Sequence, residues 1–265
     1  MKKIIIPGII VMLLVTLFAF RSHLRDAVNV LLKPQLPPEK TAVDFAKNVF
    51  PTAPPKPSTP VFADLPETVN LAVPFAPQAP FGDWSMPYQE ACEEAASIMV
   101  HRYWTGEPLD ATTMNAEILK LVDWENKTFG YYKDTNGAEI QRIVLEYFGH
   151  LHVELHYNPT IEEIKRQVAA GRPVIVPAAG RLLGNPNFHV PGPVYHALVI
   201  KGYTKTKIIT NDPGTRNGHD YLYDPDVLMH ALHEWNAQDI TKGRPVMIVV
   251  FSDAKKETGQ AVPSR

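Results

Sequence analysis

The chain has 265 residues, of which 45% are hydrophobic and 20% charged, which is ordinary for a globular protein. Its formal net charge of -2, without any run of lysine and arginine interleaved with aromatic residues, argues against nucleic acid as a partner. The single cysteine, Cys92, excludes an intramolecular disulfide and a cysteine-rich zinc site, so this thiol is either a small buried hydrophobe or a nucleophile.

An uninterrupted apolar run occupies residues 4–20, between Lys3 and Arg21. As a helix it would span roughly 25 Å, slightly less than the core of a bilayer. It is longer than a usual signal-peptide core of about 7–15 residues, and a poor cleavage site follows it. We therefore predict that residues 1–33 hold a single transmembrane helix, an uncleaved anchor being favoured over a cleaved secretory signal. The two lysines before the run favour a domain outside a bacterial cell membrane.

Proline is abundant in residues 34–61, where it prevents a continuous helix or a central strand and favours extended polyproline structure. We interpret this stretch as a semi-rigid spacer between the membrane and a folded domain. The folded domain is predicted at residues 62–254, and residues 255–265 are expected to form a disordered tail.

The elements expected in this domain alternate irregularly between helices and strands. Strands are expected at 69–75, 150–157, 173–177, 194–202, 207–211 and 245–251, and helices at 89–104, after Asp110, at 137–148, at 160–171 and after Asp224. Asn136 with Glu139 and Thr160 with Glu163 have the spacing of capping boxes, and Pro225 suits a first helical position. Without regular βαβ alternation, this order predicts an α+β fold rather than a doubly wound sheet.

Cys92 falls about one turn inside the helix expected at 89–104, where free N–H groups and the helix dipole favour a thiolate. The dipole supplies only about 1 kcal/mol, so that a histidine is also required. Glu90, Glu93 and Glu94 oppose ionisation, although the helical spacing predicts that Glu93 points to a different side from Cys92.

His196 lies in an apolar strand, on the same face as Leu198 and Ile200, and its ring nitrogens therefore need a partner. A satisfied core histidine is the plain alternative. The next strand leads into Asn211-Asp212-Pro213-Gly214, so Asp212 can reach His196 if the two strands are neighbours in the sheet. The alternative for Asp212 is a simple turn former. The order of cysteine, histidine on a strand and aspartate after the next strand indicates a cysteine hydrolase.

Four stretches carry a resemblance to the C39-like peptidases, papain-like relatives of the bacteriocin-processing double-glycine peptidases. They are Val73-Pro74-Phe75-Ala76-Pro77-Gln78, Tyr88-Gln89-Glu90-Ala91-Cys92-Glu93-Glu94-Ala95, Tyr195-His196-Ala197-Leu198-Val199-Ile200-Lys201-Gly202-Tyr203 and Asn211-Asp212-Pro213-Gly214-Thr215. The resemblance implies a papain-like fold, in which an N-terminal helix bearing the cysteine packs on an antiparallel sheet bearing His196 and Asp212. It also implies that Cys92 is the nucleophile, His196 the general base and then acid, and Asp212 the residue that orients His196.

The resemblance further implies Gln78 as a side-chain donor to the oxyanion, beside the backbone N–H of Cys92. Phe81 to Tyr88 lengthen the interval between this glutamine and the cysteine, so that Gln89 is a rival. The expected substrate is a peptide or protein, with no cofactor and no metal, and the oligomeric state is left open.

Two other functions compete with a cysteine peptidase. A catalytically inactive domain of the same fold could bind peptides or cell-wall fragments. A metal-dependent hydrolase could use His150, His152, Glu154 and His156 on one strand face, although a polar, solvated face is the favoured interpretation. His230 and His233 have helical i, i+3 spacing and could chelate a metal, but without a third ligand we interpret them as surface or packing residues.

Overall fold

The computed structural model describes residues 34–46, 65–149 and 152–251. The predicted anchor at 4–20, most of the spacer and the tail at 255–265 lie outside these ranges. Within them, none of the helices has both the length and the apolar character needed to cross a membrane.

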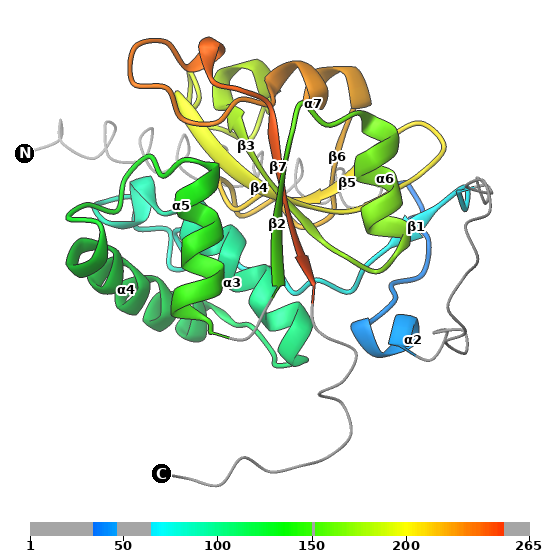
Figure 1. Ribbon diagram of the computed structural model, residues 1–265, viewed down its shortest axis with the longest axis horizontal. Helices are drawn as coiled ribbons and strands as arrows, with labels where there is room; N and C mark the ends of the chain where they lie inside the picture. Colours follow the sequence, from blue (N-terminus) through cyan, green and yellow to red (C-terminus); the bar gives the residue numbers. More distant parts are fainter. Residues whose placement is uncertain (1–33, 47–64, 150–151, 252–265) are drawn as a thin grey trace, which may run out of the picture. The chain divides into compact units, whose positions relative to one another are not determined.

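A seven-stranded antiparallel sheet forms the centre of the domain (Figure 1). Its order is β2-β7-β3-β4-β5-β6, and β1 pairs with β4 beside this path. The strands are β1 (Val69–Asn70), β2 (His152–Tyr157), β3 (Val174–Ala179), β4 (Tyr195–Tyr203), β5 (Ile208–Asn211), β6 (Tyr221–Tyr223) and β7 (Val246–Phe251). Every residue of β3 and β4 is buried, which indicates that both faces of the sheet are covered there.

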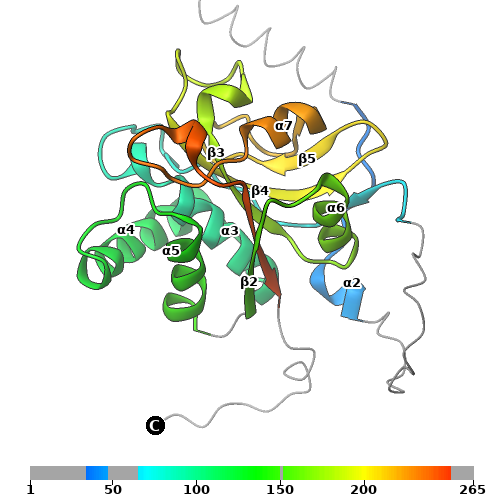
Figure 2. The same ribbon diagram turned by 45° about the horizontal axis from the view of Figure 1, so that its top comes forward.

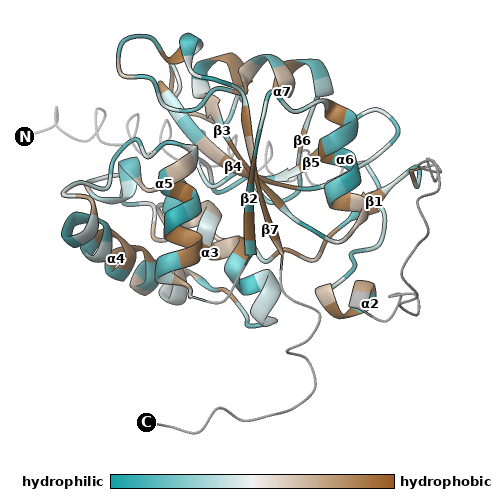
Figure 3. Ribbon diagram, in the orientation of Figure 1, coloured by the Kyte–Doolittle hydropathy of each residue, from teal (hydrophilic) through white to brown (hydrophobic). Residues whose placement is uncertain are grey.

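Helices gather at two flanks of this sheet, with α3, α4 and α5 at one flank and α6 and α7 at the other (Figure 1). They are α2 (Ala42–Ala46), α3 (Cys92–Thr105), α4 (Ala111–Thr128), α5 (Gly137–Arg142), α6 (Ile161–Ala169) and α7 (Pro225–Ala231). The apolar colouring concentrates on the central strands, whereas α4 and α6 alternate between polar and apolar residues (Figure 3). The predicted α+β class is confirmed.

Local capping chemistry sets several helix boundaries where the sequence predicts them. The side chain of Asp110 accepts a hydrogen bond from Thr113 N at the start of α4. The capping boxes of Asn136 with Glu139 and of Thr160 with Glu163 are both formed. These caps satisfy N–H groups that a helix leaves without an acceptor in its first turn.

Three of the expected elements differ in the structure, and the short strand β6 was not expected. The strand expected at 69–75 ends at Asn70, because Val73 N turns back to bond Leu71 O and Pro74 has no N–H to donate. The helix expected from 89 begins only at Cys92, after a short 3-10 turn at Tyr88–Glu90. The helix expected at 137–148 is α-helical only as far as Arg142, and Ile143–Tyr147 continue it as a π-helix.

The segment Pro37–Ala46, within the predicted spacer, is attached to the domain. Lys40 forms a parallel bridge with Leu71, and Asn70 Nδ2 donates to Pro37 O at 3.1 Å. Glu39 pairs with the ammonium of Lys201, a β4 residue with no exposed side-chain surface. In both ribbon views α2 lies near β1 and α6, away from α4 and α5 (Figures 1 and 2).

Candidate active site

Cys92 is the first residue of α3, not a residue one turn inside it as the sequence predicts. The preceding Ala91 has φ -108° and ψ 33°, which is not helical, so the helix begins at the cysteine itself. At this position the backbone N–H of Cys92 has no acceptor within the helix and the side chain lies at the positive end of the helix dipole. The thiol is only 6% exposed.

His196 and Asp212 come from adjacent strands, which is the arrangement in which the sequence allows Asp212 to reach His196. Strand β4 pairs antiparallel with β5, and Asp212 directly follows the last residue of β5. His196 Nε2 lies 2.7 Å from Asp212 Oδ1, and both side chains are buried. Burial alone would raise the pKa of Asp212, but His196 and hydrogen bonds from Tyr223 and Gly214 outweigh it and hold that pKa below its usual range.

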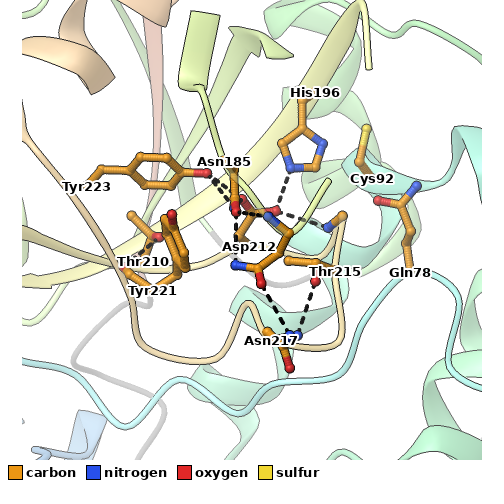
Figure 4. Close-up of polar contacts among 12 residues, drawn as sticks. Gln78, Cys92, Asn185, His196, Thr210, Asp212, Thr215, Asn217, Tyr221 and Tyr223 are labelled. Carbon is orange, nitrogen blue, oxygen red and sulfur yellow. Dashed lines mark hydrogen bonds and ion pairs between the residues drawn. The ribbon is translucent and has the colours of Figure 1, made fainter. Parts of the chain in front are cut away.

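Asn185 and Tyr223, which sequence reasoning missed, complete the surroundings of the Asp212 carboxylate together with the turn residue Gly214 (Figure 4). Asn185 Nδ2 and Tyr223 OH donate to Oδ2 at 3.0 and 2.6 Å, and Gly214 N donates to Oδ1 at 3.0 Å. Asn185, in Gly184-Asn185-Pro186, has the sequence of an ordinary turn, and Tyr223 lies in a short strand that the pattern did not predict. The carboxylate is thus fixed from both sides while it bonds the imidazole.

Phe188 also holds the His196 ring in place. The two rings meet edge to face with centroids 5.2 Å apart. A Cβ at Gly214 would lie 2.8 Å from His196 Cε1 and 2.9 Å from Phe188 Cε1, so this turn needs glycine for space. The imidazole is therefore confined by Phe188, by the turn at Gly214 and by Asp212.

The second nitrogen of the His196 ring, Nδ1, faces Cys92 in the close-up view (Figure 4). The backbone N–H of Ala197, the next residue on β4, also lies against the Cys92 sulfur. No hydrogen bond joins Cys92 to His196 among the residues that the structure describes.

The thiol instead donates to the carboxylate of Glu93, with Sγ 2.8 Å from Oε2. The prediction that Glu93 points to a different side of the helix is therefore wrong. In the first turn this long side chain can bend back to its neighbour, which the average direction of helical side chains does not anticipate. Burial, Glu93 and Glu94 raise the pKa of the Cys92 thiol well above its usual range, so it is protonated at neutral pH in this arrangement.

Glu93 is one of three buried glutamates on α3 and α4, the other two being Glu94 and Glu125. Burial raises the pKa of Glu93 to about 7 and that of Glu125 to about 8. The carboxyl of Glu94 lies against that of Glu125, and burial together with this neighbour raises its pKa well above the usual range. Glu93 has further donors in Thr135, whose N and Oγ1 lie 3.0 and 3.4 Å from Oε1.

Gln78 is next to the site, but its amide is turned away from the predicted role. Nε2 donates to the carbonyls of Tyr88 and Gln89 at 2.9 and 3.2 Å. Oε1 is buried, has no hydrogen-bond partner within the described part of the chain, and lies on the side of Cys92 (Figure 4). The side chain thus offers an acceptor, so the oxyanion role of Gln78 requires its amide to rotate and remains a prediction. The rival side chain, Gln89, is exposed and donates to Glu90.

The described β2 histidines considered as a metal site are at the surface. On β2, His156 lies 3.0 Å from Glu154 and both side chains are substantially exposed. His150 lies outside the described residues. His230 is exposed, whereas His233 is half-buried, lies beyond the end of α7 and has its Nδ1 2.7 Å from Gly243 O. One group with metal-like spacing occurs in the described ranges, formed by Glu39, His219 and Asp220. The ammonium of Lys201 already pairs with both of its carboxylates.

The residues brought together can supply a thiol, an imidazole and a carboxylate that fixes the imidazole. Residues 70–242 match the Peptidase_C39 like family. No curated protein matches the chain significantly. A candidate C39-like peptidase from Bacillus anthracis is similar with a TM-score of 0.49 at 18% identity, covering 72% of this chain and 100% of that one. The Carica candamarcensis cysteine protease CMS1MS2, in complex with E-64, has a TM-score of 0.37 at 13% identity, covering 71% and 99%.

Proposed function

We propose that this chain, which belongs to the Peptidase_C39 like family, is a peptidase that uses Cys92 as nucleophile, His196 as general base and acid, and Asp212 to orient His196. The observation that carries the proposal is the buried contact of His196 Nε2 with Asp212 Oδ1 at 2.7 Å, which leaves Nδ1 facing the cysteine (Figure 4). That contact fixes the tautomer in which Nδ1 can accept a proton.

The reaction proceeds through a thioester. His196 takes the thiol proton, and the thiolate attacks the carbonyl carbon of a peptide or related amide. The protonated imidazole then gives its proton to the leaving amine as the C–N bond breaks. Water attacks the thioester with His196 as base, and the carboxylic acid product leaves as the thiol is restored. The N–H of Cys92 can stabilise the developing oxyanion, because it has no intrahelical acceptor.

Alkylation of Cys92 by iodoacetamide tests this assignment without a known substrate, because the chain has only one thiol. At pH 6, where Glu93 is mostly protonated and its charge no longer opposes the thiolate, the full chain should react faster than a free peptide thiol. His196→Ala should react at least about tenfold more slowly than the wild type at that pH. His156→Ala, which removes an exposed histidine far along the sheet, should react as the wild type does. A wild-type rate equal to that of a free thiol and unchanged in His196→Ala would overturn the assignment.

The place of action is a second part of the proposal. The apolar run at residues 4–20 supports a membrane anchor with the peptidase domain outside the cell. In intact bacteria, an anchored domain should remain with the membrane after alkaline carbonate extraction and should be digested by added protease. Release into the medium as a shortened chain would instead establish a cleaved signal.

A further inference from the structure

The contact between Cys92 and Glu93 holds the proposed nucleophile in a resting form. The S–H group donates to Oε2 at 2.8 Å, while Nδ1 of His196 faces the same thiol without a hydrogen bond among the described residues. A carboxylate in this place accepts the thiol proton and repels a thiolate. A protonated carboxyl in the same place would do the opposite, because it could donate its own proton to the sulfur.

We propose that Glu93 is a catalytic residue of the Cys92 site, whose protonated carboxyl donates a hydrogen bond to the thiolate and whose ionised carboxylate returns the sulfur to a resting thiol. This rests on the proposed peptidase function. In the active form the thiol proton is on His196 Nδ1 and the carboxyl proton remains on Glu93. When Glu93 loses its proton to solvent, the proton of the imidazolium returns to sulfur, which closes the cycle.

The surroundings of Glu93 keep its carboxyl in place and favour its protonated form. Glu93 is 1% exposed, and Thr135 holds Oε1, which leaves Oε2 directed at Cys92. Thr135 is itself held by Tyr195 OH, which donates to its carbonyl at 2.6 Å. The titratable groups that face Glu93 from α3, α4, β4 and the loop before α5 are Cys92, Glu94, Glu125, Tyr195 and Asp134.

This arrangement predicts a site that works on the acid side of neutrality. Because burial raises the pKa of Glu93 to about 7, the carboxyl is mostly protonated at pH 6 and mostly ionised at pH 8. The fraction of molecules with a protonated Glu93 falls about tenfold between these two pH values. An ordinary thiol becomes more reactive over the same interval, so the expected change has the opposite sign.

The test is the pH profile of Cys92 alkylation by iodoacetamide in the full chain. The wild-type rate should fall about tenfold from pH 6 to pH 8, and Glu93→Gln should remain fast at pH 8, because its amide donates to the thiolate at every pH. Glu125→Gln removes a buried carboxyl that does not touch the sulfur, and its alkylation rate should still fall from pH 6 to pH 8.

In Asp134→Asn the alkylation rate should begin to fall at a lower pH than in the wild type, since the negative charge of Asp134 helps to raise the pKa of Glu93. Asn suits the left-handed backbone at this position, where φ is 56°.

The outcomes separate this inference from the proposed function. If the wild type is fast at pH 6 and depends on His196, but does not slow by pH 8 and has the same profile as Glu93→Gln, the role of Glu93 is overturned while the peptidase assignment stands. If the wild type and His196→Ala both behave as free thiols at every pH, both proposals fail. Asp134→Asn keeps the role of Glu93 testable should Glu93→Gln not fold.

Discussion

Single residues around His196 determine whether the imidazole is held where it can take the proton of Cys92. Among them, Gly214 leaves no space for a larger side chain. A methyl group there would lie 2.8 Å from His196 Cε1 and 2.9 Å from Phe188 Cε1, so one or both rings must move. We expect Gly214→Ala to lose most of the rapid alkylation of Cys92 at pH 6, because the ring leaves its contact with Asp212. Thermal unfolding followed by circular dichroism should show a fold that is retained. Unchanged alkylation would contradict the confinement of the ring.

Tyr223 provides a second test at this scale, because its hydroxyl donates to a buried carboxylate at 2.6 Å. Tyr223→Phe should lower the free energy of unfolding by about 1.5–3 kcal/mol, the usual range for a hydrogen bond to a charged group. Tyr221→Phe is a matched control, since its ring packs against that of Tyr223 with centroids 4.7 Å apart and no hydrogen bond joins its hydroxyl to Asp212. Urea unfolding should separate the two variants, and equal losses would show that Tyr223 contributes only packing.

The sequence indicated a strand through His196 and a turn after Asp212, because an apolar run and the Pro-Gly pair are local signals. It could not predict the contact of Glu93 with the thiol, which depends on how one long side chain bends within the first helical turn. Nor could it predict Asn185 as a partner of Asp212. These residues are 27 positions apart and meet only when the loop before β4 packs beside the end of β5.

Elements whose boundaries depend on local chemistry were predicted best. Capping boxes at Asn136 and Thr160 and the N-cap at Asp110 formed as expected. The pairing of β4 with β5, on which the contact of Asp212 with His196 depended, is present. The start of α3 at Cys92 was not predicted, because the apolar pattern continues backward through the 3-10 turn at Tyr88–Glu90. Periodicity alone does not distinguish that turn from the helix that follows.

The segment Pro37–Ala46 shows how an element predicted as spacer contributes to the fold. Glu39 and Asp220 both pair with Lys201, whose side chain has no exposed surface. We expect Glu39→Gln to lower the free energy of unfolding by about 1–3 kcal/mol, less than the cost of breaking a fully buried pair because Glu39 is itself 43% exposed. Glu67→Gln breaks an exposed pair with Lys205 and should cost at most about 0.5 kcal/mol. If Glu39→Gln and Glu67→Gln lower the free energy of unfolding in urea by similar amounts, the attachment of the segment does not depend on the ion pair of Glu39 with Lys201.

At the scale of the whole molecule, the buried carboxyls of Glu93, Glu94 and Glu125 make stability depend on pH. Burial raises the folded-state pKa of each carboxyl above its unfolded value of 4.5. Their contribution to the free energy of unfolding is therefore fully present below pH 4.5 and is lost as pH rises through about 7 for Glu93 and about 8 for Glu125. Asp212 acts in the opposite sense. Its pKa is lowered when folded, so its contribution is present above 3.8 and lost below that value.

These opposite dependences place the expected maximum of stability in mildly acid solution, near the conditions in which Glu93 is protonated. Between the unfolded and folded pKa, a single buried carboxyl costs about 1.4 kcal/mol of stability per pH unit. We therefore expect the free energy of unfolding, measured in urea, to fall between pH 5 and pH 8. Glu125→Gln should make this fall less steep, because one carboxyl no longer has to ionise in the core. A wild-type stability that is constant or rising over this range would show that the three carboxyls are not held protonated, and the acid-side activity proposed for Cys92 would lose its structural basis.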